Sequence, residues 1–145
     1  MLVVPPGVWA ETLERFRRCG AGRRECVTYW TGPADSPEIL DAAVHPDHAA
    51  SRGSYELDGR WLHEFWVELG RSRRSVRVQV HTHAFEAFHS RTDDLWPIVH
   101  VPGFLSLVIP QFAAQFLRGQ LYLTEIDETG MWNQVDLDSR LAGIP

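Results

Sequence analysis

The sequence contains no lysine, and all 14 of its basic residues are arginine. It has only two cysteines, Cys19 and Cys26, at a spacing that matches no zinc-binding pair, so we expect two reduced thiols in or near the core. It has no apolar run long enough to span a bilayer, and Met1 to Pro6 lack the basic start and long apolar stretch of a signal peptide. These absences exclude a disulfide scaffold and a membrane protein, and they predict a cytoplasmic location.

The chain also lacks a positive charge balance, since its formal net charge is −5. This argues against general nucleic-acid binding. Arginines do cluster within 15–24 and 71–77, where we expect solvated faces, with an acidic partner surface as the alternative. There is no glycine-rich phosphate loop and no Cys/His pairing that suggests a thiol protease.

Residues 1–145 suit a single domain that is long enough to bury a core. No repeat, low-complexity tract or linker divides them. Apolar spacing and turn residues predict strands and helices mixed along the chain, and hence one sheet packed by helices. The expected strands are 2–4, 25–30, 39–44, 76–83, 104–109, 121–126 and 131–136, and the expected helices are 8–20, 58–70 and a last turn at 137–141.

The clearest strand pattern, over residues 76–83, alternates between apolar and polar side chains. Successive side chains of a strand point to opposite faces. We therefore expect Val76, Val78 and Val80 on one face, and His81 and His83 together on the other. Two imidazoles placed in this way can converge on one metal ion.

A carboxylate, Asp93, follows ten residues after His83, beyond an expected loop. Two imidazoles and one carboxylate suit zinc, and three protein ligands leave the fourth position for water. A lone His-x-His pair is weak evidence for a metal, and Asp94 is a less well-spaced alternative to Asp93. Ser90-x-x-Asp93 also resembles a capping box at the start of a helix, which would fix where Asp93 points.

The combination of His81-x-His83 with Ser90-x-x-Asp93 resembles the metal motif of the JAMM (JAB/MPN) metalloproteases. A glutamate on an earlier strand completes that family's site, and Glu25 stands in the matching place. Six residues separate His83 from Ser90, one fewer than is usual in the family.

Beyond the motif, the order of expected elements matches the family from about residue 2 to residue 136. Ala84 replaces a proline that is common in the family after the second histidine. Residues 87–94 resemble the compact bacterial branch, whose members are often encoded beside ubiquitin-like proteins and their activating and conjugating enzymes.

The resemblance implies an α/β domain: a mixed, mostly antiparallel curved sheet with helices on both sides. It implies one Zn²⁺ per chain with a bound water, held by His81, His83 and Asp93. A carboxylate near that water can take its proton and pass it to the leaving amine, and Glu25 matches the family position for this role. The Ser90 hydroxyl would stabilise the oxyanion. On the residues alone, three other glutamates compete as the base: Glu56, Glu64 and Glu86.

The function implied by the resemblance is removal of a bacterial ubiquitin-like protein from its conjugates, or trimming of its C-terminal tail. The substrate partner is then the ubiquitin-like protein or its conjugate, and activating and conjugating enzymes of the same operon are further partners. Two alternatives stay open. One is a hydrolase that releases an amino-acid adduct or tail from a sulfur-carrier protein, and the other is a non-catalytic scaffold of the same fold.

Two further features need an explanation. The segment His45-Pro46-Asp47-His48 is either a second metal cluster or, as we expect, a polar loop. The absence of lysine fits the codon bias of a GC-rich genome. As an alternative, a deconjugating enzyme held near conjugating enzymes escapes modification when its surface offers no lysine amine.

Overall fold

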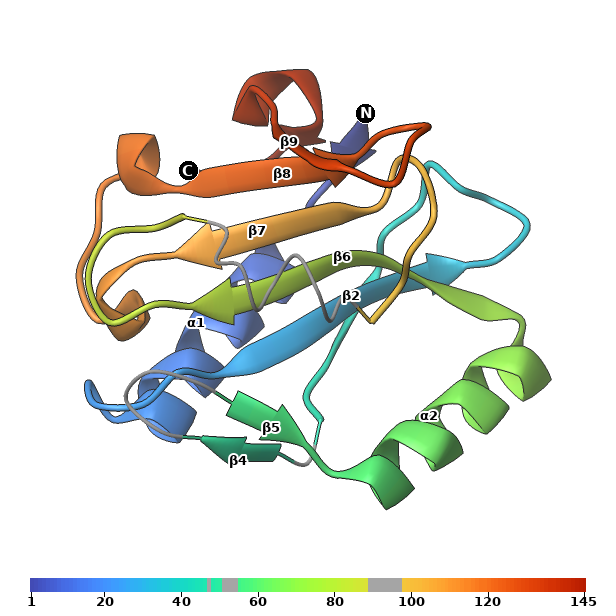
Figure 1. The fold of residues 1–145 in the computed structure, drawn as a ribbon, viewed down its shortest axis with the longest axis horizontal. Helices are drawn as coiled ribbons and strands as arrows, with labels where there is room; N and C mark the ends of the chain where they lie inside the picture. Colours follow the sequence, from blue (N-terminus) through green and yellow to red (C-terminus); the bar gives the residue numbers. More distant parts are fainter. Residues whose placement is uncertain (47, 51–54, 89–97) are drawn as a thin grey trace.

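The computed structural model describes residues 1–46, 48–50, 55–88 and 98–145 (Figure 1). A six-stranded sheet with the order β3-β2-β6-β7-β8-β9 forms its centre. Within this sheet, among the described residues, β6 and β7 are the one parallel pair, which confirms the mixed, mostly antiparallel sheet. The strands of this sheet are β2 (Val27–Pro33), β3 (Ala42–Val44), β6 (Arg74–Thr82), β7 (Leu105–Ile109), β8 (Tyr122–Ile126) and β9 (Trp132–Gln134).

Two helices, α1 (Pro6–Gly20) and α2 (Gly59–Ser72), pack on opposite faces of the sheet (Figure 1). Phe16 of α1 belongs to a buried cluster that contains Trp30 of β2. Phe65 of α2 belongs to a second buried cluster, which contains Tyr29, the neighbour of Trp30 on the same strand. Because successive strand residues face opposite ways, β2 is buried on both sides. The expected helices on both sides of the sheet are confirmed.

A chain of hydrogen bonds fixes α1 to the sheet. The indole Nε1 of Trp30 donates to Thr12 Oγ1 at 2.8 Å, and that hydroxyl donates to Val8 O at 2.8 Å. Both side chains are buried, so each polar group needs its partner. The helix ends where predicted, at Gly20, because Ala21 adopts a left-handed conformation and turns the chain back.

The second helix begins where predicted, after Asp58, whose side chain caps it by accepting a hydrogen bond from Trp61 N at 2.8 Å. Trp61 stacks on Phe65, and Phe65 stacks on Tyr29 of β2, at ring-centre distances of 4.7 and 5.8 Å. Trp66, by contrast, does not face the core, although its place among the apolar residues of the helix suggests it. Its side chain is 42% exposed, because it lies one position beyond the buried stripe.

The predicted alternation along β6 is wrong at one residue. Trp30 pairs with Val78, whereas the next residue of β2, Thr31, pairs with Val76, so Arg77 is an extra residue in a bulge. A bulge reverses the facing of every residue beyond it. Val76 therefore joins the cluster under α2, while Val78 and Val80 join the cluster under α1.

Several expected boundaries shift in the structure. The strand expected over 25–30 begins at Val27 and runs to Pro33, and the strand expected over 39–44 is only Ala42–Val44. Short elements that were not predicted are the hairpin of β4 (His48–Ala50) with β5 (Tyr55–Leu57), and β10 (Leu141–Ala142), which pairs in parallel with β1 (Leu2–Val3). Three short 3₁₀ helices complete the described elements: η1 (Gln111–Ala113), η2 (Arg118–Gln120) and η3 (Leu137–Ser139).

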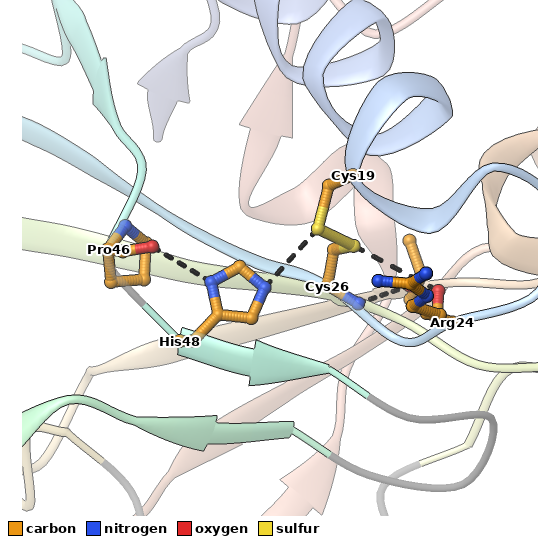
Figure 2. The surroundings of a disulfide bond; sticks show 6 residues. Cys19, Arg24, Cys26, Pro46 and His48 are labelled. Carbon is orange, nitrogen blue, oxygen red and sulfur yellow. Dashed lines mark hydrogen bonds between the residues drawn. A yellow bond between two sulfur atoms is a disulfide. The ribbon is translucent and has the colours of Figure 1, made fainter.

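The expectation of two reduced cysteines is also wrong for this structure, because Cys19 and Cys26 form a disulfide (Figure 2). The left-handed turn after α1 reverses the chain, so that Cys26, just before β2, returns to the end of the helix. This brings the two Cα atoms to 6.3 Å, within the range that a disulfide requires.

None of the helices in the described parts of the chain is long and apolar enough to cross a membrane.

Candidate metal centre

The two predicted metal-binding histidines lie side by side at the end of β6. His81 is the penultimate residue of the strand and is fully buried, and His83 follows the strand and is 6% exposed. Their ring centres are 5.2 Å apart and the ring planes are inclined by 46°. The structure thus places both imidazoles on the same face of the sheet, at the end of β6.

The main chain of His83 is fixed although β6 has already ended. Its N–H donates to Ile109 O at 3.0 Å, and its carbonyl accepts from Phe112 N at 2.8 Å. These bonds join it to the end of β7 and the segment just beyond. The histidine pair therefore lies on a rigid part of the sheet, where the spacing of the two rings is set by the backbone.

Glu25 lies just before β2, the strand that pairs with β6 next to the two histidines. Val27 pairs with His81 in the antiparallel ladder between β2 and β6. Beyond the ladder, Thr82 N donates to Cys26 O at 3.0 Å, and Cys26 N donates to the Thr82 hydroxyl at 2.9 Å. Continuing this register by one residue places Glu25 opposite His83, at a half-buried position. The main chain at Glu25 therefore lies near the end of β6, where the two histidines are.

The two histidines fit a zinc ion. Two imidazoles bound to one tetrahedral zinc through bonds of about 2.0–2.1 Å have ring centres about 5 Å apart. The observed separation of 5.2 Å matches this requirement. Phe88 packs edge-on against the His83 ring at 4.6 Å and shields it on one side. Shielding from water strengthens the interactions of a bound ion with its ligands.

The other predicted site residues, Ser90 and Asp93, lie outside the described residues, as does the alternative ligand Asp94. Of the glutamates that compete with Glu25, Glu86 is exposed, and Glu64 is exposed on α2 beside Arg60. The side chain of Glu56 is not described. Of the candidate glutamates whose side chains are described, Glu25 is the one that the strand register brings near the histidines.

Phe88 borders the His83 ring and Phe85 lies two residues after His83, and neither was predicted as part of the site. Their side chains are 67% and 51% exposed, although they lie within five residues of His83. The signal was present, because aromatic residues in a loop next to metal ligands have no core to fill. These rings give the site an apolar margin.

Comparison with known proteins gives the family. No family model matches the sequence. The chain is 35% identical over 126 residues to the probable metalloprotease y4jG of Sinorhizobium fredii (strain NBRC 101917 / NGR234), covering 83% of this chain and 78% of the relative. Identity at this level over most of both chains, with a histidine pair suited to a metal, defines a metal-dependent hydrolase.

Solved structures agree with the fold. Protein DSY2949 of Desulfitobacterium hafniense is 14% identical with a TM-score of 0.66, over 94% of this chain and 90% of that one. AF2198, a JAB1/MPN domain protein of Archaeoglobus fulgidus, is 12% identical with a TM-score of 0.53, over 100% and 97%. A protein of Salinibacter ruber is 18% identical with a TM-score of 0.55, over 99% and 92%. The chain belongs to the JAMM (JAB/MPN) metalloprotease family.

Proposed function

We propose that this protein is a zinc-dependent isopeptidase or peptidase. Its substrate is a bacterial ubiquitin-like protein, which it removes from conjugates or whose C-terminal tail it trims. The observation that carries the proposal is the buried pair His81 and His83, with ring centres 5.2 Å apart, in a member of a metalloprotease family. The strand register, continued from Val27 to Glu25, supports Glu25 as the proton acceptor beside this pair.

His81, His83 and Asp93 would hold the zinc, which when bound supplies Lewis acidity that polarises the scissile carbonyl and acidifies a water. The Glu25 carboxylate accepts the proton of the attacking water and then delivers it to the amine that leaves. The Ser90 hydroxyl donates a hydrogen bond to the oxygen on which negative charge develops. Atoms balance, because one water and one amide give one carboxylic acid and one amine.

The exposed rings of Phe85 and Phe88 support an extended peptide as the substrate. Aromatic surfaces beside a catalytic centre bind apolar side chains and exclude water from the reacting groups. The net charge of −5 gives no general attraction to nucleic acid. We place the protein in the cytoplasm, where the activating and conjugating enzymes of the same operon would be its further partners.

The experiment combines metal analysis with substrate cleavage. Purified protein should contain zinc and should cleave a fusion or isopeptide conjugate of the ubiquitin-like protein encoded beside it. The double variant His81→Ala/His83→Ala should lose both properties. His63→Ala, on the exposed side of α2, is the matched control and should keep both. Chelation should abolish cleavage without unfolding the protein, because the two buried apolar clusters include neither His81 nor His83.

The outcomes separate the candidate functions. Full hydrolytic activity without zinc would contradict the proposal. Zinc binding with cleavage only of an adduct on a sulfur-carrier protein would give the alternative enzyme function. Absence of both metal and cleavage would make the protein a scaffold of the same fold.

A further inference from the structure

A second group of metal-binding side chains lies beside the end of α1, on the face of the sheet opposite the histidine pair (Figure 2). Cys19 comes from the last turn of α1, Cys26 directly precedes β2, and His48 begins β4. One ligand atom of each lies within 4.8 Å of the other two. Three segments that are distant in sequence therefore converge on one point, which is buried at Cys26 and half-buried at Cys19 and His48.

The His48 ring is oriented as a ligand. Its Nδ1 lies 2.8 Å from Pro46 O, and because a carbonyl only accepts, the Nδ1–H is the donor. In the neutral ring the lone pair then lies on Nε2, which is 3.3 Å from Cys19 Sγ. A backbone carbonyl that fixes the proton on one ring nitrogen is the usual support of a histidine that binds a metal through its other nitrogen.

We propose that the reduced pair Cys19 and Cys26 binds one zinc ion together with His48 Nε2, at a site separate from the histidine pair on β6. A dithiol reductant first transfers two electrons and two protons to the disulfide and leaves as its own cyclic disulfide. Binding of Zn²⁺ then releases both thiol protons, so that two thiolates and one neutral imidazole hold the ion. Three protein ligands leave one position for water.

The distances suit this site. A tetrahedral zinc holds a thiolate sulfur and an imidazole nitrogen about 3.5 Å apart, and two thiolate sulfurs about 3.8 Å apart. Cys19 Sγ and His48 Nε2 are already 3.3 Å apart. Only the two sulfurs must separate after reduction, which small side-chain rotations allow because the Cα atoms are 6.3 Å apart.

Such a site would keep one structural link intact in either redox state. Cys26 neighbours Glu25, and its backbone pairs with Thr82 between the two histidines of β6. The bond to Cys19 joins this start of β2 to the end of α1. Disulfides are rarely stable in a reducing cytoplasm, and a zinc ion would replace the disulfide as the link there.

The test counts zinc in a background that lacks the first site. The His81→Ala/His83→Ala variant is equilibrated with Zn²⁺ under a phosphine reductant, freed of loosely bound metal by gel filtration, and analysed for zinc and protein. We expect one zinc per chain when reduced and none after oxidation with diamide. Adding Cys19→Ser or His48→Ala should remove the zinc, while adding His100→Ala, an exposed control, should not. Cobalt in place of zinc should show thiolate-to-metal absorption only in the reduced protein.

Wild-type protein keeps the proposal testable if the double variant does not fold. It should hold two zinc ions when reduced and one when oxidised. One ion when reduced and none when oxidised would leave the cysteine site standing and remove the proposed function instead. Equal zinc content in both redox states, or zinc that survives Cys19→Ser or His48→Ala, would overturn the cysteine site and leave a simple disulfide.

Discussion

Glu25 lies where β2 has not yet begun but its register with β6 continues. Two imidazoles, Asp93 and a water complete a tetrahedral zinc, so Glu25 should act on the proton and not on the metal. Glu25→Gln keeps the shape of the side chain and removes its basicity. Zinc content should therefore stay near wild type, while the cleavage rate falls by about 10²–10⁴-fold.

The control for this variant is Glu86→Gln, at an exposed glutamate that also lies near His83 in sequence. It should retain zinc and nearly full activity. Loss of activity in Glu86→Gln with an active Glu25→Gln enzyme would transfer the role of the base to Glu86. Loss of zinc in Glu25→Gln would make Glu25 a ligand and refute the assignment.

Ser90 has two predicted roles that a single substitution separates. If its hydroxyl stabilises the oxyanion, Ser90→Ala should lower the turnover rate by about 10²–10³-fold. If it only caps a helix, the substitution should cost about 1 kcal/mol of stability and leave the rate unchanged. Steady-state kinetics and a urea melt on the same preparation give both numbers. We expect the loss of rate.

The half-buried side chain of His45 should make the stability of the folded protein depend on pH. Burial, with Arg15 and His48 nearby, lowers the pKa of His45 to about 4 from 6.5. Between pH 6.5 and about pH 4, His45 therefore binds a proton in the unfolded chain but not in the folded chain. The free energy of unfolding should fall as the pH drops from about 6.5 to about 4. His45→Phe, which keeps a ring against Phe16, should lose less stability between pH 7.5 and pH 5 in urea melts. An equal loss in both proteins would contradict this role.

At the scale of elements, the bulge in β6 and the loop after β2 form one unit. The Arg77 guanidinium donates to the carbonyl oxygens of Pro33, Ser36 and Ile39. These bonds draw the loop against β2 so closely that Gly32 has no room for a side chain. A Cβ at residue 32 would lie 1.9 Å from Ile39 O, which is backbone and cannot rotate away.

Gly32→Ala should therefore destabilise the protein by about 1–3 kcal/mol or more, measured from urea melts. Gly70→Ala is the matched control, because no atom lies within 4 Å of its added Cβ on α2. Replacing a helical glycine by alanine should stabilise by about 0.5–1 kcal/mol. Equal stability of Gly32→Ala and wild type would mean that the loop can move away at no cost.

The long elements could be predicted because their signals are local. A cap at Asp58, an apolar stripe and a terminal glycine each act within one or two turns, so both helices and most central strands were found. The bulge at Arg77 could not be found, because it exists only in the pairing of two strands. The hairpin of β4 and β5 and the strand β10 are too short to show a period.

The placement of the histidine pair was predictable for a similar reason, whereas contacts between distant segments were not. Two histidines on alternate strand positions must share a face, which local geometry alone decides. The contact of His48 with Cys19 joins residues 29 positions apart, so no local sequence pattern predicts it. The disulfide was missed because only the left-handed turn after α1 brings its cysteines together.

At the scale of the whole molecule, the basic surface consists only of arginine. Both helices carry exposed ion pairs, namely Arg18 with Glu14, Arg60 with Glu64 and Arg71 with Glu68. Exposed pairs of this kind contribute at most about 1 kcal/mol each. Stability therefore gives little reason to reject lysine at these positions. Codon bias and avoidance of self-modification remain as the two explanations.

Substitution of one arginine distinguishes them. The Arg60 side chain is 90% exposed, so Arg60→Lys should change stability by no more than about 0.5 kcal/mol while it adds an accessible amine. In the Glu25→Gln background, co-expression with the activating and conjugating enzymes should attach the ubiquitin-like protein to Lys at position 60, visible by mass spectrometry. Arg60→Gln, which removes the positive charge and offers no amine, should stay unmodified, as should wild type. If the lysine variant also stays unmodified, or if other proteins of the same genome are equally poor in lysine, codon bias suffices.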